Sequence, residues 1–283
     1  MWTTRYILRD IDDLVAEIKA YTKRYDITSL QFYDLTAITK KRWTAEFCQR
    51  LIDEGLALGW TLPSGTRSEA LDETTLSLMK EAGCTYLVYA PESGSERTLH
   101  RIKKRIKLKS LTHSVLTARR LGITVRANLI IGFPGETRAD IFKTILYGLR
   151  LAILGVDEVP INLYSSYPGS EIFDELVASG KVELDDDYFL SLTSINSDFA
   201  AMNPMTLNEY VGPRELALYR LAAMSLNYGL GYLIYLPRIV RTLRNVFGDN
   251  AHAATVLEHR IKDARRRRIS ARHKGDPDQL VTR

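Results

Sequence analysis

Polar residues that could bind a ligand are concentrated in short clusters that each follow an apolar segment. In the first, Glu92-Ser93-Gly94-Ser95 combines a carboxylate with two hydroxyls. The carboxylate can accept hydrogen bonds from ribose hydroxyls or from an amine, whereas Ser93 and free backbone N–H groups can donate to a carboxylate or a phosphate. A simpler interpretation is that Ser93 or Ser95 caps the next helix, and taken alone the cluster favours that cap.

Two further clusters are rich in glycine. Residues 132–137 read GFPGET, in which Gly132 permits close backbone approach and Pro134-Gly135 forms a tight turn. Residues 167–171 read YPGSE, which is also typical of a turn. Each of these two clusters is equally compatible with an ordinary connection between a strand and a helix.

Strand and helix patterns alternate over the first 180 residues, and this alternation positions the clusters. Strands are predicted at 27–34, 59–64, 84–90, 123–131 and 156–165. Helices are predicted from an N-cap at Asp10 and at 44–58, 72–82, 108–121, 138–154 and 170–179. The alternation indicates an α/β fold with parallel strands, in an open sheet or a barrel, and in either case ligands meet the carboxyl ends of the strands. Asp34 ends the first predicted strand and Arg67 follows the second.

The pattern changes after residue 185. A loop is predicted at 185–204, followed by helices at 208–228, 232–247 and 251–268 with glycine-containing breaks between them. We therefore expect a domain over 1–200, a helical region over 201–268 and a disordered tail over 269–283.

Charge and composition narrow the classes of protein. The net charge is +5, but residues 238–283 carry +7 and the first 237 residues carry −2. The basic tail leaves open a weak contact with a membrane surface, and without interleaved aromatic residues it gives no expectation of nucleic-acid binding. The apolar segment 221–236 is shorter than the ~20 residues of a spanning helix. The start of the chain has no apolar signal segment, so the cytoplasm is the expected location.

The three clusters, taken in order, resemble the radical S-adenosylmethionine (SAM) superfamily. The resemblance is to the branch whose members often carry a cobalamin-binding domain, such as anaerobic magnesium-protoporphyrin ester cyclases. It covers roughly residues 1–200 and implies a partial (β/α) barrel with SAM across the carboxyl ends of its strands. In the family, a [4Fe-4S] cluster then cleaves SAM reductively to start radical chemistry on a small-molecule substrate.

The resemblance also implies which residues would contact SAM. Asp34 would lie near the methionine amine and Arg67 near the carboxylate, with Glu92 and Ser93 at the ribose or methionine polar groups. Asn128, Ile130 and Gly132 would line the adenine side, although Asn128 and Gly135 depart from the family's usual fifth-strand motif, G-x-I-x-G-x-x-E.

The family's cluster-binding motif, C-x-x-x-C-x-x-C, is absent from this sequence. The two cysteines, Cys48 and Cys84, are 36 residues apart and are predicted to be structural. Because the sequence resembles its relatives from just after the third cysteine, we expect a barrel that lacks its first strand and cluster loop.

On this expectation a [4Fe-4S] cluster would be present only if a missing N-terminal segment, or an upstream polypeptide carrying the motif, supplies the cysteines. Cobalamin would belong to the full-length parent, and the truncated chain alone would be inactive. Two alternatives stay open. One is a degenerate, non-catalytic barrel that binds SAM or a partner, and the other is an ordinary β/α enzyme that uses Asp34 or Glu92.

Overall fold

The computed structural model describes residues 7–34, 38, 40–66, 71–197, 206–248 and 254–273. Within these residues one parallel sheet has the strand order β1-β2-β3-β4-β5. The strands are β1 (Ser29–Gln31), β2 (Gly59–Thr66), β3 (Cys84–Glu92), β4 (Thr124–Ile131) and β5 (Ile161–Leu163). Each strand pairs with its neighbour in sequence and the order never reverses, so the sheet is a segment of a β/α barrel and not a doubly wound sheet.

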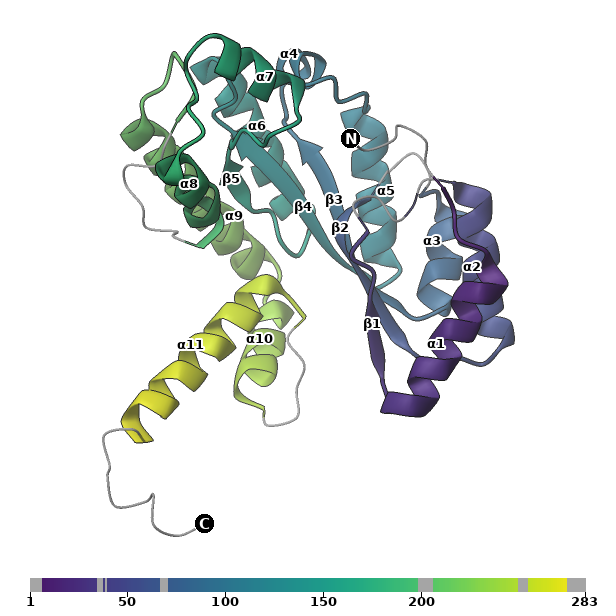
Figure 1. Cartoon of the computed structure of the whole chain (residues 1–283). Coiled ribbons are helices and arrows are strands. Elements are labelled where there is room, and N and C mark those ends of the chain that lie inside the picture. The colour runs from purple at the N-terminus through teal and green to yellow at the C-terminus, as the bar shows by residue number, and fades with distance from the viewer. Residues whose placement is uncertain are drawn as a thin grey trace. The chain divides into compact units, whose positions relative to one another are not determined.

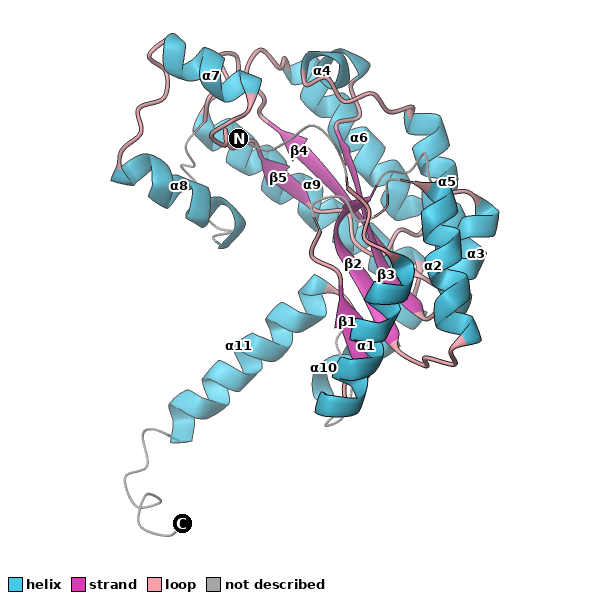
Figure 2. Ribbon diagram, turned by 45° about the vertical axis from the view of Figure 1, so that its right-hand side comes forward, coloured by secondary structure: helices cyan, strands magenta, loops and turns pink. Residues whose placement is uncertain are grey.

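Helices connect the strands, and α2, α3, α5 and α6 cover one face of the sheet (Figure 1, Figure 2). Those up to residue 153 are α1 (Ile11–Tyr25), α2 (Lys41–Asp53), α3 (Glu73–Glu81), α4 (Glu96–Arg101), α5 (Leu108–Arg120) and α6 (Arg138–Ile153). The later ones are α7 (Glu171–Ala178), α8 (Asp186–Ser197), α9 (Pro213–Ile234), α10 (Pro237–Phe247) and α11 (Val256–His273). The predicted N-cap at Asp10 is confirmed, because its side chain accepts a hydrogen bond from the Asp13 backbone N–H at 3.0 Å.

The two faces of the sheet differ in burial, as β4 shows. Its burial alternates residue by residue, with Leu129 and its odd-numbered neighbours fully buried and the even-numbered residues half-buried. A Cβ atom added to Gly148 of α6 would lie 2.9 Å from Leu129 Cδ1, so the buried face is the one against the helices. Asn128 and Ile130 therefore face away from the helix layer, as expected for the inward face of a barrel segment.

The prediction of a loop at 185–204 is wrong over α8. The three consecutive aspartates that suggested a loop instead begin this helix. Asp185 accepts a hydrogen bond from the Tyr188 backbone N–H at 2.8 Å, and Asp186 and Asp187 occupy the first turn. Acidic residues at these positions stabilise a helix N-terminus, an effect that the low helix propensity of aspartate does not reveal.

Two other predicted elements are shorter or displaced. The helix predicted at 44–58 runs from Lys41 to Asp53, because Gly55 adopts a left-handed φ of 62° just beyond its end. The strand predicted at 156–165 is regular only over β5, because Pro160 cannot donate to the ladder.

The chain divides into two compact units, Met1–Leu230 and Gly231–Arg283. The break predicted at residues 229–231 is absent, because α9 continues through both glycines to Ile234. The boundary predicted near residue 200 lies outside the described residues. In the second unit, α11 extends to His273, so residues 269–273 of the predicted disordered tail are helical. No described helix is long and apolar enough to cross a membrane.

Candidate functional site

Glu92 ends β3 in an unusual backbone conformation. Its φ of 63° lies in the left-handed region, and the pairing of β3 with β4 shifts register between Tyr89 and Glu92. A non-glycine residue pays a conformational cost there, and such residues are concentrated at binding and active sites. The Glu92 carboxylate is half-buried and forms an ion pair with Lys104, with 3.1 Å between Oε1 and Nζ.

Ser93 and Gly94 attach the loop after β3 to helix α6. Ser93 is 0% exposed, and its hydroxyl lies 2.9 Å from Thr144 Oγ1, which also accepts the Gly94 N–H at 3.1 Å. A Cβ atom on Gly94 would lie 2.5 Å from the backbone oxygen of Lys143. The loop therefore needs glycine at 94 and a small hydroxyl residue at 93 to lie this close to α6.

Ser95 confirms the capping interpretation of the first cluster. It is the N-cap of α4, and its side chain accepts from the Thr98 backbone N–H. Its hydroxyl also donates to Asp140 at 2.7 Å, and Arg97 forms an ion pair with the same carboxylate. The capping residue thus also connects the loop after β3 to the start of α6.

Asp140 is the junction between the two strand-end loops. It is 2% exposed, and burial disfavours its charged form, but the hydrogen bonds from Arg97, Thr137 and Ser95 outweigh burial and hold its pKa well below the usual range. Its side chain also accepts from the backbone N–H of Thr137, completing a capping box at the start of α6. A charged Asp140 therefore joins α4, α6 and both loops.

The Glu136 side chain folds back and accepts hydrogen bonds from the backbone of its own GFPGET turn. Its Oε2 accepts the backbone N–H groups of Gly132 at 2.7 Å and Phe133 at 3.1 Å, and Thr98 of α4 donates to its Oε1 at 3.2 Å. The residue is 2% exposed, and burial raises its pKa to about 7 despite these hydrogen bonds. The role of Glu136 was missed by the sequence analysis, since a carboxylate that accepts from its own turn leaves no pattern beyond its spacing.

The three residues predicted on the adenine side lie together at the carboxyl end of β4. Asn128 and Ile130 are half-buried on the sheet face away from α6, and Gly132 follows the strand with a φ of 88°. Arg126 lies on the same face, and its Nε donates to Asn128 Oδ1 at 2.7 Å. This edge offers the Asn128 amide and the apolar side chain of Ile130, which suits a ligand with both polar and apolar parts. Gly132 is buried, and its backbone N–H donates to Glu136.

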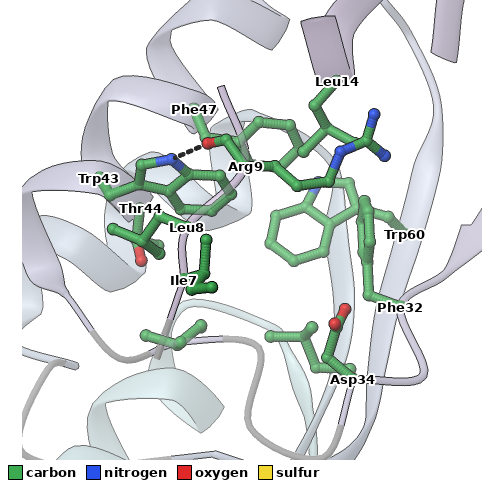
Figure 3. Close-up of a pocket in the computed structure, with 12 residues that line it drawn as sticks. Ile7, Leu8, Arg9, Leu14, Phe32, Asp34, Trp43, Thr44, Phe47 and Trp60 are labelled. Atoms are coloured by element: carbon green, nitrogen blue, oxygen red, sulfur yellow. Dashed lines mark hydrogen bonds between the residues drawn. The ribbon is translucent and has the colours of Figure 1, made fainter. Parts of the chain in front are cut away.

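Asp34 lies apart from this group. It is exposed just beyond β1 and lines a largely apolar cavity of 240 Å³ between the sheet and α2, beside Phe32 (Figure 3). The other predicted site residues that the structure describes do not line this cavity. Arg67 lies outside the described residues, so its predicted contact with the SAM carboxylate remains a prediction.

The cysteines do not fit an iron–sulfur cluster. Cys48 in α2 and Cys84 in β3 are both free and 0% exposed in the core. Burial raises the pKa of the Cys48 thiol to about 12 and raises that of Cys84 as well, which disfavours the thiolate that binds iron. The described residues contain no group of three or more His, Cys, Asp or Glu that could hold a metal ion.

A β/α barrel segment with two glycine-containing loops at the carboxyl ends of neighbouring strands defines the class of protein as a β/α-barrel type with a strand-end site. The chain belongs to the radical SAM superfamily, whose sequence model matches residues 2–147. It is 30% identical over 169 residues to an uncharacterized methyltransferase of Pyrococcus horikoshii, and this match covers 60% of the chain and 36% of that protein.

Other relatives have more specific names. The chain is 27% identical to cytidylyl-2-hydroxyethylphosphonate methyltransferase of Streptomyces wedmorensis, over 66% of the chain and 36% of that protein. It is 24% identical to anaerobic magnesium-protoporphyrin IX monomethyl ester cyclase of Rubrivivax gelatinosus, over 64% of the chain and 32% of that protein. The chain thus spans about a third of the length of these curated relatives.

A solved structure supports the fold. The radical SAM methyltransferase TsrM of Kitasatospora setae, with cobalamin and a [4Fe-4S] cluster bound, matches with a TM-score of 0.57 at 13% identity. The match covers 96% of this chain and 56% of that chain. The predicted fold class and family are therefore confirmed.

Proposed function

We propose that this chain is the SAM-binding part of a radical SAM methyltransferase catalytic domain. The observation that carries the proposal is that the loop after β3 and helix α4 are joined to the loop after β4 and helix α6 at the carboxyl ends of the strands. The bonds are Ser93–Thr144, Ser95–Asp140 and Thr98–Glu136. That end of a β/α barrel segment is where ligands bind. When bound, SAM would supply a methyl group or, after reductive cleavage, a 5′-deoxyadenosyl radical.

Each residue has a distinct part in this proposal. Asn128, Ile130 and the backbone at Gly132 would hold the adenine side, and Glu92 would accept hydrogen bonds from the ribose. Ser93 would act as a positioning residue, because its buried hydroxyl bonds to Thr144 and fixes the loop that carries Glu92. Asp34 would contact the methionine amine and Arg67 the carboxylate, as the family resemblance implies.

The cluster-binding cysteines would come from a polypeptide segment other than the residues of this sequence. This follows from the donor set, because the two thiols present are buried within the core. A second candidate function, a barrel that binds SAM without cleaving it, is favoured by the same observation. The first candidate function would also involve a small-molecule substrate, a cytoplasmic location and, in the full-length protein, cobalamin.

Methyl transfer is the reaction class best supported among radical SAM chemistries. The Pyrococcus and Streptomyces relatives are both named as methyltransferases, and the similar solved structure is a methyltransferase as well. The chain covers only about a third of the named relatives, so the substrate would be selected partly by residues beyond it.

The test is SAM binding by the whole chain, measured by calorimetry with two matched variants. Ile130→Asn changes the carboxyl end of β4, and Thr124→Asn changes the other end of the same strand face. We expect Ile130→Asn to weaken SAM binding by about tenfold, from the loss of an apolar contact and the burial of an amide, and Thr124→Asn to leave it unchanged. Equal effects of both variants, or no binding by the unaltered chain, would refute the proposal.

A further inference from the structure

The connection between α4 and α5 is strongly basic. Residues 101–109 contain six Lys or Arg and no acidic residue, a charge of +6. The first 237 residues together carry −2, so the rest of that span carries −8. A positive cluster on an otherwise acidic body produces a local field that attracts anions.

Two ion pairs place this basic segment at the strand ends. Lys104 pairs with Glu92, the last residue of β3, and Lys103 pairs with Glu171, the first residue of α7 after β5. Figure 1 shows α4 and α7 at the same end of the sheet. The basic segment therefore lies beside the edge where the proposed SAM site is formed.

The segment lines a hollow of 610 Å³ that is open to solvent. Leu99, Ile106 and Leu108 supply apolar walls, and Glu96 is the acidic residue that lines it. The exposed side chains of Arg105, Lys107 and Lys109 also line the hollow, and no acidic partner is found for them among the residues that the structure describes. The ion pairs of Lys103 and Lys104 thus leave most of the positive charge available to a ligand.

We infer that this hollow binds the phosphate or diphosphate group of a small-molecule ligand whose reacting part lies over the sheet. The inference rests on the proposed function and adds the chemical class of the substrate. Lys and Arg side chains form strong charge-assisted hydrogen bonds with phosphate oxygens. The volume lies within the range of about 300–1,000 Å³ that is typical of small-molecule sites.

The lining argues against a nucleic-acid strand as the occupant. Proteins that hold single strands combine basic grooves with aromatic side chains on which bases stack. No Phe, Tyr or Trp lines this hollow. Its positive charges also come from one short segment and do not form an extended track along which a strand could run.

The experiment is a calorimetric titration of the whole chain with inorganic pyrophosphate. The test variant carries Lys107→Glu and Lys109→Glu, and the matched control carries Lys23→Glu and Lys143→Glu, two exposed lysines in α1 and α6. Lys107 and Lys109 lie at the N-cap and in the first turn of α5, where acidic residues favour the helix, so the test variant should fold. We expect pyrophosphate affinity to fall by at least about tenfold in the test variant and less than about twofold in the control.

SAM binding, measured on the same proteins, separates this inference from the proposed function. SAM binding without pyrophosphate binding, or an equal loss of pyrophosphate affinity in both variants, would overturn the inference alone. Lysine-dependent pyrophosphate binding without SAM binding would support an anion site and refute the SAM proposal. A short single-stranded RNA that binds the same lysines more tightly than pyrophosphate would identify nucleic acid as the ligand and overturn the inference.

Discussion

Two buried carboxylates, in the turn after β4 and in the first turn of α6, show how neighbouring groups determine the ionisation of a side chain. Asp140 and Glu136 are each 2% exposed. Asp140 accepts from a guanidinium, two hydroxyls and a backbone N–H, which together hold its pKa low. Glu136 has no cationic partner among its hydrogen bonds, so burial dominates and its pKa rises. At neutral pH the start of α6 therefore contains a fixed charge, and the turn before it contains a group close to its titration midpoint.

Glu136 should make the stability of the first unit depend on pH. Its pKa is raised from an ordinary 4.5 to about 7, so its contribution is fully present below pH 4.5 and is lost as the pH rises through about 7. Glu136→Gln keeps the shape and the acceptor for Gly132 but does not titrate. Between pH 5 and 8 we expect the unaltered chain to lose about 1–3 kcal/mol more unfolding free energy than the variant, measured by urea denaturation.

Other groups that titrate over this range contribute equally to the pH dependence of both proteins, so the difference between the two profiles reports on Glu136. Parallel pH profiles for the unaltered chain and Glu136→Gln would show that Glu136 keeps an ordinary pKa. The burial argument would then fail for this turn.

Gly94 tests the close approach between the loop after β3 and α6. A Cβ atom there would lie 2.5 Å from Lys143 O and 2.7 Å from Tyr147 Cβ. We expect Gly94→Ala to lower the unfolding free energy by about 2–4 kcal/mol, because a backbone atom must move. Gly229→Ala is the control, since nothing lies within 4 Å of its added Cβ and alanine favours α9. A thermal shift of the same size and sign in both variants would contradict this packing argument.

At the scale of elements, the loops after β3 and β4 form one unit with α4 and the start of α6. Hydrogen bonds join them at Ser93–Thr144, Ser95–Asp140 and Thr98–Glu136. The partners are 38 to 51 residues apart in sequence, so the contacts depend on the tertiary fold that brings β3 and β4 side by side. The energetic effects of changes in these connected elements should therefore be coupled.

A double-mutant cycle measures this connection. Thr144→Val removes the acceptor for Gly94 and the partner of Ser93, and each single change, Thr144→Val or Ser93→Ala, should cost about 1–3 kcal/mol of unfolding free energy. Because both changes break the same hydrogen bond, the double variant should cost about 1 kcal/mol less than the sum. Costs that add without any coupling in chemical denaturation would show that Ser93 and Thr144 do not stabilise each other in the folded protein.

The sequence predicted the elements better than their connections. Alternating apolar segments and capping residues located five strands and most helices, because those signals are local. The helix after Asp185 was missed because consecutive aspartates are typical of both loops and helix starts. The bonds of Ser93, Asp140 and Glu136 could not be predicted, since they depend on which helix packs over the loop. The same holds for the hollow beside α5, which requires the α4–α5 connection to fold back.

At the scale of the whole molecule, the described residues supply the strand-end loops of a radical SAM fold but no accessible cysteine thiol. Cys48 and Cys84 are buried in the core. After anaerobic incubation with iron and sulfide, we expect this chain alone to show no absorbance from a thiolate-bound cluster. Cys48→Ala and Cys84→Ala should not change that result, and a stable cluster that depends on either cysteine would contradict the assignment of both to the core.

The central claim is that SAM binds across the joined loops at the carboxyl end of the sheet. Hydrogen exchange of the backbone amides, measured with and without SAM, tests it most directly. We predict that SAM slows exchange at residues 92–97 and 132–137 together, and leaves residues 55–58 and 121–123 at the opposite end of the strands unchanged. Protection confined to that opposite end, or no change at either end under saturating SAM, would contradict the account.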